Sequence, residues 1–138
     1  TLLLMTFAAA KITRLKTAMF DAAKRGVNIQ LILEFEQESG GQLSHDALAA
    51  FAGSIEHRAD IYYWPLEHRE KNAAGKPGKL HAKCAVVDDA VLVSSANLTD
   101  DAFNRNIEMG VLLRAPALAA QLRGHFAGLI EAGVLKLI

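Results

Sequence analysis

The sequence predicts an α/β domain in which a mixed, mostly parallel β-sheet is flanked by helices on both faces. Short apolar runs typical of strands alternate along the chain with segments of helical period, which is the pattern of α/β proteins. With 138 residues, of which 51% are hydrophobic, the chain is long enough to bury a core without disulfides. We therefore expect residues 1–138 to form a single domain.

The first third of the chain predicts a βαβ unit. Leu2–Thr6 is a short apolar run, as in a buried strand. Apolar residues recur at intervals of three and four from Lys11 to Lys24, and Gly26 provides a stop for this helix. Val27–Leu33 then predicts a strand parallel to the first. Because the chain opens with Thr1 directly before a strand, we expect the natural protein to begin earlier.

Residues 34–42 predict a polar loop at the carboxyl end of that strand, where open α/β sheets tend to bind ligands. Glu34, Glu36 and Glu38 are possible catalytic acids, but their spacing gives them no partner, so we expect a solvated acidic loop. Ser44 can cap a second helix. Further on, residues 59–64 and 106–113 predict strands, and Pro116 predicts the start of the last helix.

The reactive side chains are concentrated on a predicted hairpin from Leu80 to Ala96. Side chains alternate along a strand, so His81 and Lys83 share a face, roughly 6.6 Å apart. After a tight turn, Ser95 and Asn97 share a face of the antiparallel partner strand. The hairpin therefore predicts a basic, nucleophilic and amide-bearing surface.

These side chains suit the hydrolysis of a phosphodiester. Neutral imidazole is a competent nucleophile, so His81 can attack phosphorus. Lys83 can hold a nonbridging oxygen as a point charge, while Ser95 and Asn97 can donate hydrogen bonds to the same phosphate. We expect no metal ion and no other cofactor.

The order and spacing of these residues resemble the phospholipase D superfamily. His81-x-Lys83, Asp88 five residues after the lysine, and Ser94-Ser95-x-Asn97 are similar to its His-x-Lys-x4-Asp and Gly-Ser-x-Asn motifs. Ser94 replaces the usual glycine, and the turn before it is one residue shorter than in the family. Neither departure removes a reactive group.

The resemblance implies a phospholipase D-like fold and a phosphohistidine intermediate at His81. It also implies a role for Glu108, the carboxylate after the Ser/Asn strand, which would accept the other ring N–H of His81. Asp88 belongs to the motif, but by alternation it faces away from His81, so we expect a turn residue that orders the hairpin or pairs with a cation. Because the superfamily uses two motifs across a twofold axis, the single motif here implies a homodimer or a duplicated partner.

Three further segments, Leu33–Ser44, Ser95–Thr99 and Asn106–Gly110, are similar to the phospholipase D-like component of the DISARM anti-phage defence systems. This resemblance implies a role in antiviral defence, with other defence proteins as partners.

The segment from Glu67 to Lys83 carries the strongest charge bias. Five basic residues stand against two acidic ones, a net charge of +3 in a chain whose formal net charge is zero. Two interpretations of this segment remain possible: a solvated loop, or a loop that binds substrate phosphates. The candidates for contact with a substrate backbone are Arg69, Lys71, Lys76 and Lys79.

Composition indicates a cytoplasmic protein. No apolar run reaches the roughly 18 residues that a membrane span needs. The single cysteine, Cys84, excludes an internal disulfide, fits a reducing compartment and is expected to be buried packing.

Three functions remain open at this point. The first is a metal-independent phosphodiesterase that acts on nucleic acid, with DNA favoured. The second is a phospholipid hydrolase or transferase, although the sequence shows no amphipathic membrane-binding patch. The third is a defence-complex subunit that binds DNA or proteins without turnover, which His81→Ala would leave biologically active.

Overall fold

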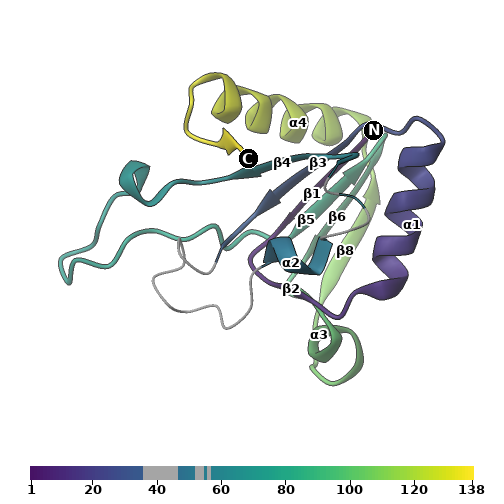
Figure 1. The fold of residues 1–138 in the computed structure, drawn as a ribbon, viewed down its shortest axis with the longest axis horizontal. Coiled ribbons are helices and arrows are strands. Elements are labelled where there is room, and N and C mark those ends of the chain that lie inside the picture. Colours follow the sequence, from purple (N-terminus) through teal and green to yellow (C-terminus); the bar gives the residue numbers. More distant parts are fainter. Residues whose placement is uncertain (36–46, 52–54, 56) are drawn as a thin grey trace.

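The computed structural model describes residues 1–35, 47–51, 55 and 57–138 (Figure 1). The strands are β1 (Leu2–Thr6), β2 (Ala9–Ala10), β3 (Ile29–Leu33), β4 (Asp60–Tyr63), β5 (Cys84–Val87), β6 (Ala90–Ser94), β7 (Leu98–Thr99), β8 (Gly110–Arg114) and β9 (Lys136–Leu137). The helices are α1 (Thr13–Lys24), α2 (Ala47–Phe51), α3 (Asp100–Asn104) and α4 (Pro116–Glu131), with a short 3₁₀ turn at Leu66–His68.

One seven-stranded sheet, in the order β8-β6-β5-β1-β3-β4-β9, organises the domain. β1 pairs with β3 and β3 with β4 in parallel, as the βαβ pattern predicted. The four other pairings are antiparallel, so the sheet is mixed but not mostly parallel as expected. The tight turn of the β5–β6 hairpin accounts for one of these pairings, because it allows only antiparallel strands. β2 and β7 form a separate two-stranded parallel sheet.

Helices cover both faces of the sheet, as the sequence predicted (Figure 1). The side chains of β1 alternate between two apolar clusters. Leu4 packs in the cluster that contains Met19 of α1 and Phe51 of α2. Leu3 packs on the opposite face, in the cluster that contains Ala119 of α4. The central strands are therefore buried on both sides, which holds the neighbouring β5 in place.

Several element boundaries differ from those expected. The hairpin strand begins at Cys84 rather than Leu80, so residues 79–83 precede the strand. The strand predicted from residue 106 begins at Gly110. The first helix ends as expected, with Gly26 at a φ of +83° that favours glycine. Glu36, Glu38 and the predicted cap Ser44 lie outside the described residues.

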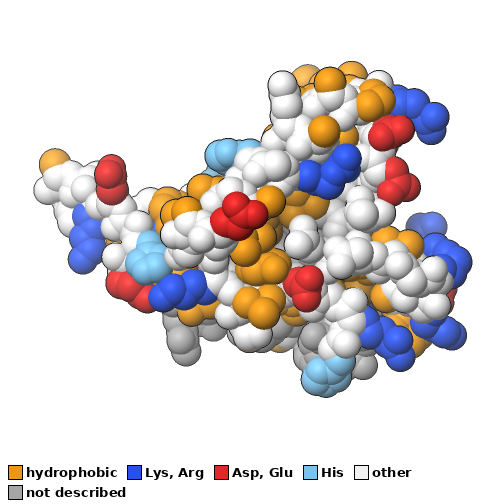
Figure 2. Space-filling model, turned by 90° about the horizontal axis from the view of Figure 1, so that it is seen from above, with side chains coloured by type: hydrophobic (Ala, Val, Ile, Leu, Met, Phe, Trp, Pro, Cys, Tyr) orange, Lys and Arg blue, Asp and Glu red, His pale blue; other side chains and the backbone are white. Residues whose placement is uncertain are grey.

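The charged segment after β4 extends away from the sheet (Figure 1) and presents side chains of both signs (Figure 2). It carries its own hydrogen bonds. Lys71 forms a β-bridge with Pro77, and Asn72 Oδ1 accepts from the backbone N–H groups of Ala74 and Lys76, both at 3.0 Å. None of the helices in the described part of the chain is long and apolar enough to cross a membrane.

Candidate functional site

The β5–β6 hairpin brings the predicted reactive residues together at its open end. His81 and Lys83 lie just before β5, whereas Ser95 and Asn97 lie just after β6. Because the strands are antiparallel, the start of one lies beside the end of the other. The Ser94 N–H donates to the Lys83 carbonyl at 3.2 Å, which extends the pairing to the edge of the site.

Phe7 forms one wall of this site, at the carboxyl end of β1. Its ring lies 5.2 Å from the imidazole of His81, centroid to centroid. The Lys83 Nζ lies 5.6 Å from the centre of the same ring, within cation–π range. Sequence reasoning missed Phe7, because a lone aromatic after a buried strand gives no distinguishing signal.

Lys83 is fixed beside His81 rather than extended into solvent. Its Nζ donates to the His81 carbonyl at 2.7 Å. Partial burial lowers the pKa of Lys83, while the negative charge of Glu108 acts in the opposite direction. The ammonium is therefore held by one carbonyl and one ring face, which leaves it donors for a phosphate oxygen.

His81 is exposed, and its pKa is lowered from the ordinary value. The largest cause is the positive charge of Lys83, followed by desolvation and the charge of Lys79. Each disfavours the imidazolium. The neutral ring, whose free lone pair can attack phosphorus, is thus favoured at a lower pH than in an ordinary histidine.

Glu108 is oriented by two hydrogen bonds. Ser95 Oγ donates to Oε2 at 2.5 Å, and Asn106 Nδ2 donates to Oε1 at 3.1 Å. These bonds, and the charge of Lys83, lower the pKa of the Glu108 carboxyl. The expected bond from His81 is not formed in this structure. One carboxylate oxygen accepts from Ser95 and the other from Asn106. Glu108 is thus connected to the other site residues by its hydrogen bond from Ser95.

Ser95 and Asn97 occupy different environments. Ser95 Oγ also accepts from the Met109 N–H at 3.1 Å, so this hydroxyl is held between residues 108 and 109. Asn97 Oδ1 is buried and accepts no hydrogen bond from any described residue. A buried amide oxygen without a partner is costly, so Asn97 Oδ1 can still accept a hydrogen bond from a donor on a ligand.

Ser94 stands where the motif has glycine, and the paired strand compensates for its side chain. Ser94 pairs with Gly110 in the β6–β8 ladder. A Cβ at position 110 would lie 2.9 Å from the Val93 carbonyl oxygen and 3.2 Å from Ser94 Cβ, too close to be accommodated. The Ser94 hydroxyl meanwhile accepts from the Ala96 N–H at 3.0 Å and so braces the turn into the site.

Asp88 is not part of this group. It lies in the turn between β5 and β6, at the opposite end of β5 from His81, with a φ of +48°. Its backbone carbonyl accepts a hydrogen bond from Arg123 of α4. The alternation argument thus placed Asp88 correctly, in the turn and away from His81.

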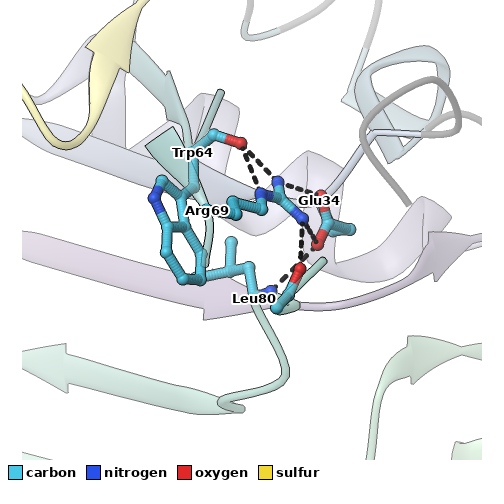
Figure 3. A network of polar contacts seen from close by, with 5 residues as sticks. Glu34, Trp64, Arg69 and Leu80 are labelled. Carbon is cyan, nitrogen blue, oxygen red and sulfur yellow. Dashed lines mark hydrogen bonds and ion pairs between the residues drawn. The ribbon is translucent and has the colours of Figure 1, made fainter. Parts of the chain in front are cut away.

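Two expectations about charged residues are wrong. Arg69 was expected to contact substrate and Glu34 to be solvated, but both side chains are fully buried and form an ion pair with each other, 2.8 Å apart (Figure 3). Of the candidate phosphate contacts, Lys71, Lys76 and Lys79 are exposed.

Cys84 is partly buried beside the apolar cluster under α4, and burial raises the pKa of its thiol. This is close to the packing role expected for it. Within the described residues, no group of three or more His, Cys, Asp or Glu side chains is placed to bind a metal ion.

The mixed sheet and the residues gathered at the open end of its hairpin define an α/β domain of phospholipase D-like fold. A family model described as cardiolipin synthase, phospholipase D-like domain, matches residues 1–130, so the chain belongs to that family. No curated protein matches the chain.

Solved structures share this fold. NucT from Helicobacter pylori aligns with a TM-score of 0.75 and 17% identity, over 94% of this chain and 78% of that one. Nuc from Salmonella typhimurium, a phospholipase D family member, aligns at 0.65 and 22% identity, over 99% and 79% of the two chains. TrmBL2, an archaeal chromatin protein, aligns at 0.55 and 17% identity, over 99% of this chain and 44% of that one.

The charge of Lys83 should set the acidity of His81. We predict that Lys83→Met raises the pKa of the His81 imidazole toward its ordinary value of about 6.5, because the largest repulsion against the imidazolium is removed. NMR titration of the five histidines measures this. Lys24→Met, on α1, is the control and should leave that pKa unchanged. A His81 pKa that stays the same or falls in Lys83→Met would contradict the electrostatic account.

Proposed function

We propose that the protein is a metal-independent phosphodiesterase that cleaves nucleic acid through a phosphohistidine at His81. The observation that carries this proposal is the arrangement at the hairpin end. His81, whose pKa is lowered, lies beside the ammonium group of Lys83, which donates to the His81 carbonyl. The Ser95 hydroxyl, the Asn97 amide and the Glu108 carboxylate lie at the same end of the hairpin. This set supplies a nucleophile and counter-charges for a phosphate.

In the first step, the His81 nitrogen bonds to phosphorus while the bond from phosphorus to the leaving oxygen breaks. Lys83 neutralises the negative charge that develops on the nonbridging oxygens, and the Asn97 side-chain N–H donates a hydrogen bond to them. The leaving oxygen needs a proton, which His81 can no longer provide once it is bonded to phosphorus. Water then attacks phosphorus, releases His81 and gives up a proton. A second acid–base group is therefore required for both steps.

We propose that a second copy of the chain supplies this group as its own His81. The two histidines would then hold opposite protonation states and titrate as a coupled pair. The structure offers a surface for this copy next to the site, the apolar strip. Its side chains are each at least 44% exposed: Ile107, Met109, Val111, Leu112 and Leu113.

The position of the apolar strip supports a second copy as its occupant. β8 is the edge strand of the sheet, so its outer backbone edge is open to pairing. Glu108, which bonds Ser95, lies within the apolar strip, between Ile107 and Met109. A copy seated there would place its own site close to this one, which the chemistry requires.

Nucleic acid is the proposed substrate because of the exposed lysines in the segment leading to His81. Lys71, Lys76 and Lys79 could follow a phosphate backbone beyond the reacting group. The neighbour TrmBL2 is described as binding DNA. The alternative, a phospholipid, is favoured by the family description as a cardiolipin synthase domain.

We further propose a role in anti-phage defence, with other defence proteins as partners. This proposal rests on the resemblance of three sequence segments to the DISARM component, and part of the first segment lies outside the described residues. A non-catalytic role in such a complex is the competing possibility.

The proposed activity is tested with oligonucleotides and with anionic phospholipid vesicles, both in EDTA. We predict hydrolysis of the oligonucleotide in chelator, and its loss by at least about 10³-fold in His81→Ala. Asp101→Asn, on α3, serves as the control and should keep the wild-type rate. Hydrolysis of the vesicle lipid alone would establish the phospholipid function, and activity that returns only with added magnesium or zinc would rule out the mechanism.

The proposed dimer is tested by charge at the apolar strip. Val111→Glu should yield a monomer of unchanged melting temperature that has lost hydrolysis, because the side chain is already 54% exposed and only the contact between copies changes. Analytical ultracentrifugation gives the mass. Leu137→Glu, on β9 at the opposite edge of the sheet, should remain dimeric. Full activity per chain in a wild-type monomer would refute the dimer.

A further inference from the structure

The buried pair Glu34–Arg69 lies beside the proposed site, and the chemistry described so far does not use it (Figure 3). Glu34 directly follows β3, while Arg69 follows the 3₁₀ turn after β4. Both side chains are completely buried. Ionised groups are rarely buried in this way unless they are paired and hydrogen-bonded, so their contacts need an explanation.

Arg69 uses all five of its N–H donors. The guanidinium donates to both oxygens of Glu34, at 2.8 and 2.9 Å. It also donates twice to the Trp64 carbonyl, once at 3.0 Å, and to the Gly78 carbonyl at 3.1 Å. Arg69 therefore joins the two ends of the charged segment between β4 and His81.

Glu34 completes the connection on the other side. Its Oε2 accepts from the backbone N–H of Leu80 at 2.9 Å, in addition to the bond from Arg69. Leu80 is buried and immediately precedes His81. Residues 79–83 lie outside any strand, so no ladder fixes the backbone here. On the other side of His81, the Lys83 carbonyl accepts from the Ser94 N–H.

We propose that Glu34 and Arg69 are positioning residues that hold the backbone of His81 in place for attack. The carboxylate anchors Leu80 to the end of the buried strand β3, and the guanidinium keeps that carboxylate oriented. This inference rests on the proposed function for its consequence in catalysis, but the anchor itself is a property of the fold. A misplacement of a reacting group by about 1 Å can cost about 10²-fold in rate.

Two double variants separate positioning from stability. Glu34→Met with Arg69→Met removes the ion pair and also the acceptor for Leu80. Glu34→Gln with Arg69→Met removes the ion pair but keeps an amide oxygen for Leu80. Neither variant leaves a buried charge without a partner, and such replacements are often tolerated. We expect kcat to fall about 10²-fold in the first variant and by no more than about tenfold in the second. KM should change little in either variant. Equal kcat values in two folded variants would overturn the proposal.

A measurement on the wild-type chain does not depend on how the variants fold. The amide of Leu80 should exchange with solvent at least about 10²-fold more slowly than that of exposed Ala82. Equal exchange rates would overturn the proposal. The histidine NMR spectrum adds a readout free of activity: the first double variant should shift or broaden the His81 signal but not that of His125 on α4. If the wild type hydrolyses nothing while Leu80 is protected and the His81 signal responds, the proposed function fails and the anchor stands.

Discussion

The antiparallel register of β5 and β6 is the constraint on which the site depends. Cys84 pairs with Val93, so Lys83 and Ser94 meet at the next position, and His81 and Ser95 follow at the open end. A slip of one residue would turn the shifted strand over, so that its inward-facing side chains would point outward. The register is protected because Val86 and Val91 are fully buried under α4, and this core would be exposed by such a slip.

Two kinds of polar interaction surround this register and differ in burial. The bonds among Ser95, Asn106 and Glu108 are made near the surface, where water can replace them, so they suit groups that rearrange when a substrate binds. The Glu34–Arg69 pair is fully buried, so breaking one side would leave an uncompensated charge in the interior. The reactive groups are thus adjustable, while the backbone that carries the histidine is firmly held.

Much of the site could be predicted from local spacing in the sequence. Alternation and a tight turn place His81, Lys83, Ser95 and Asn97 at one end of a hairpin whether or not the strand extends to His81. The superfamily followed from the motif on this hairpin, the α/β fold class followed from the alternation of strand and helix patterns along the chain, and both are confirmed. The predicted balance of strands failed, because a sequence pattern does not show that β5 pairs antiparallel to β1, or that β8 and β9 pair antiparallel at the two edges of the sheet.

The rest depended on contacts between residues far apart in the chain. Glu34 and Arg69 are 35 positions apart, and carboxylates after a strand are more often solvated than buried. The bond between Glu108 and Ser95 could not be predicted, because it depends on where residues 107–109 cross the end of β6. Similarly, the glycine missing from the motif at Ser94 is offset by Gly110, a relation visible only in the β6–β8 register.

The most direct measurement is the mass of the chain after rapid alkaline quenching of a reaction with an oligonucleotide in EDTA. The account predicts a transient adduct with the mass of the oligonucleotide fragment that keeps the attacked phosphorus, on the peptide that contains His81 and on no other. Turnover without any such adduct, or an adduct on a different residue, would contradict nucleophilic attack by His81.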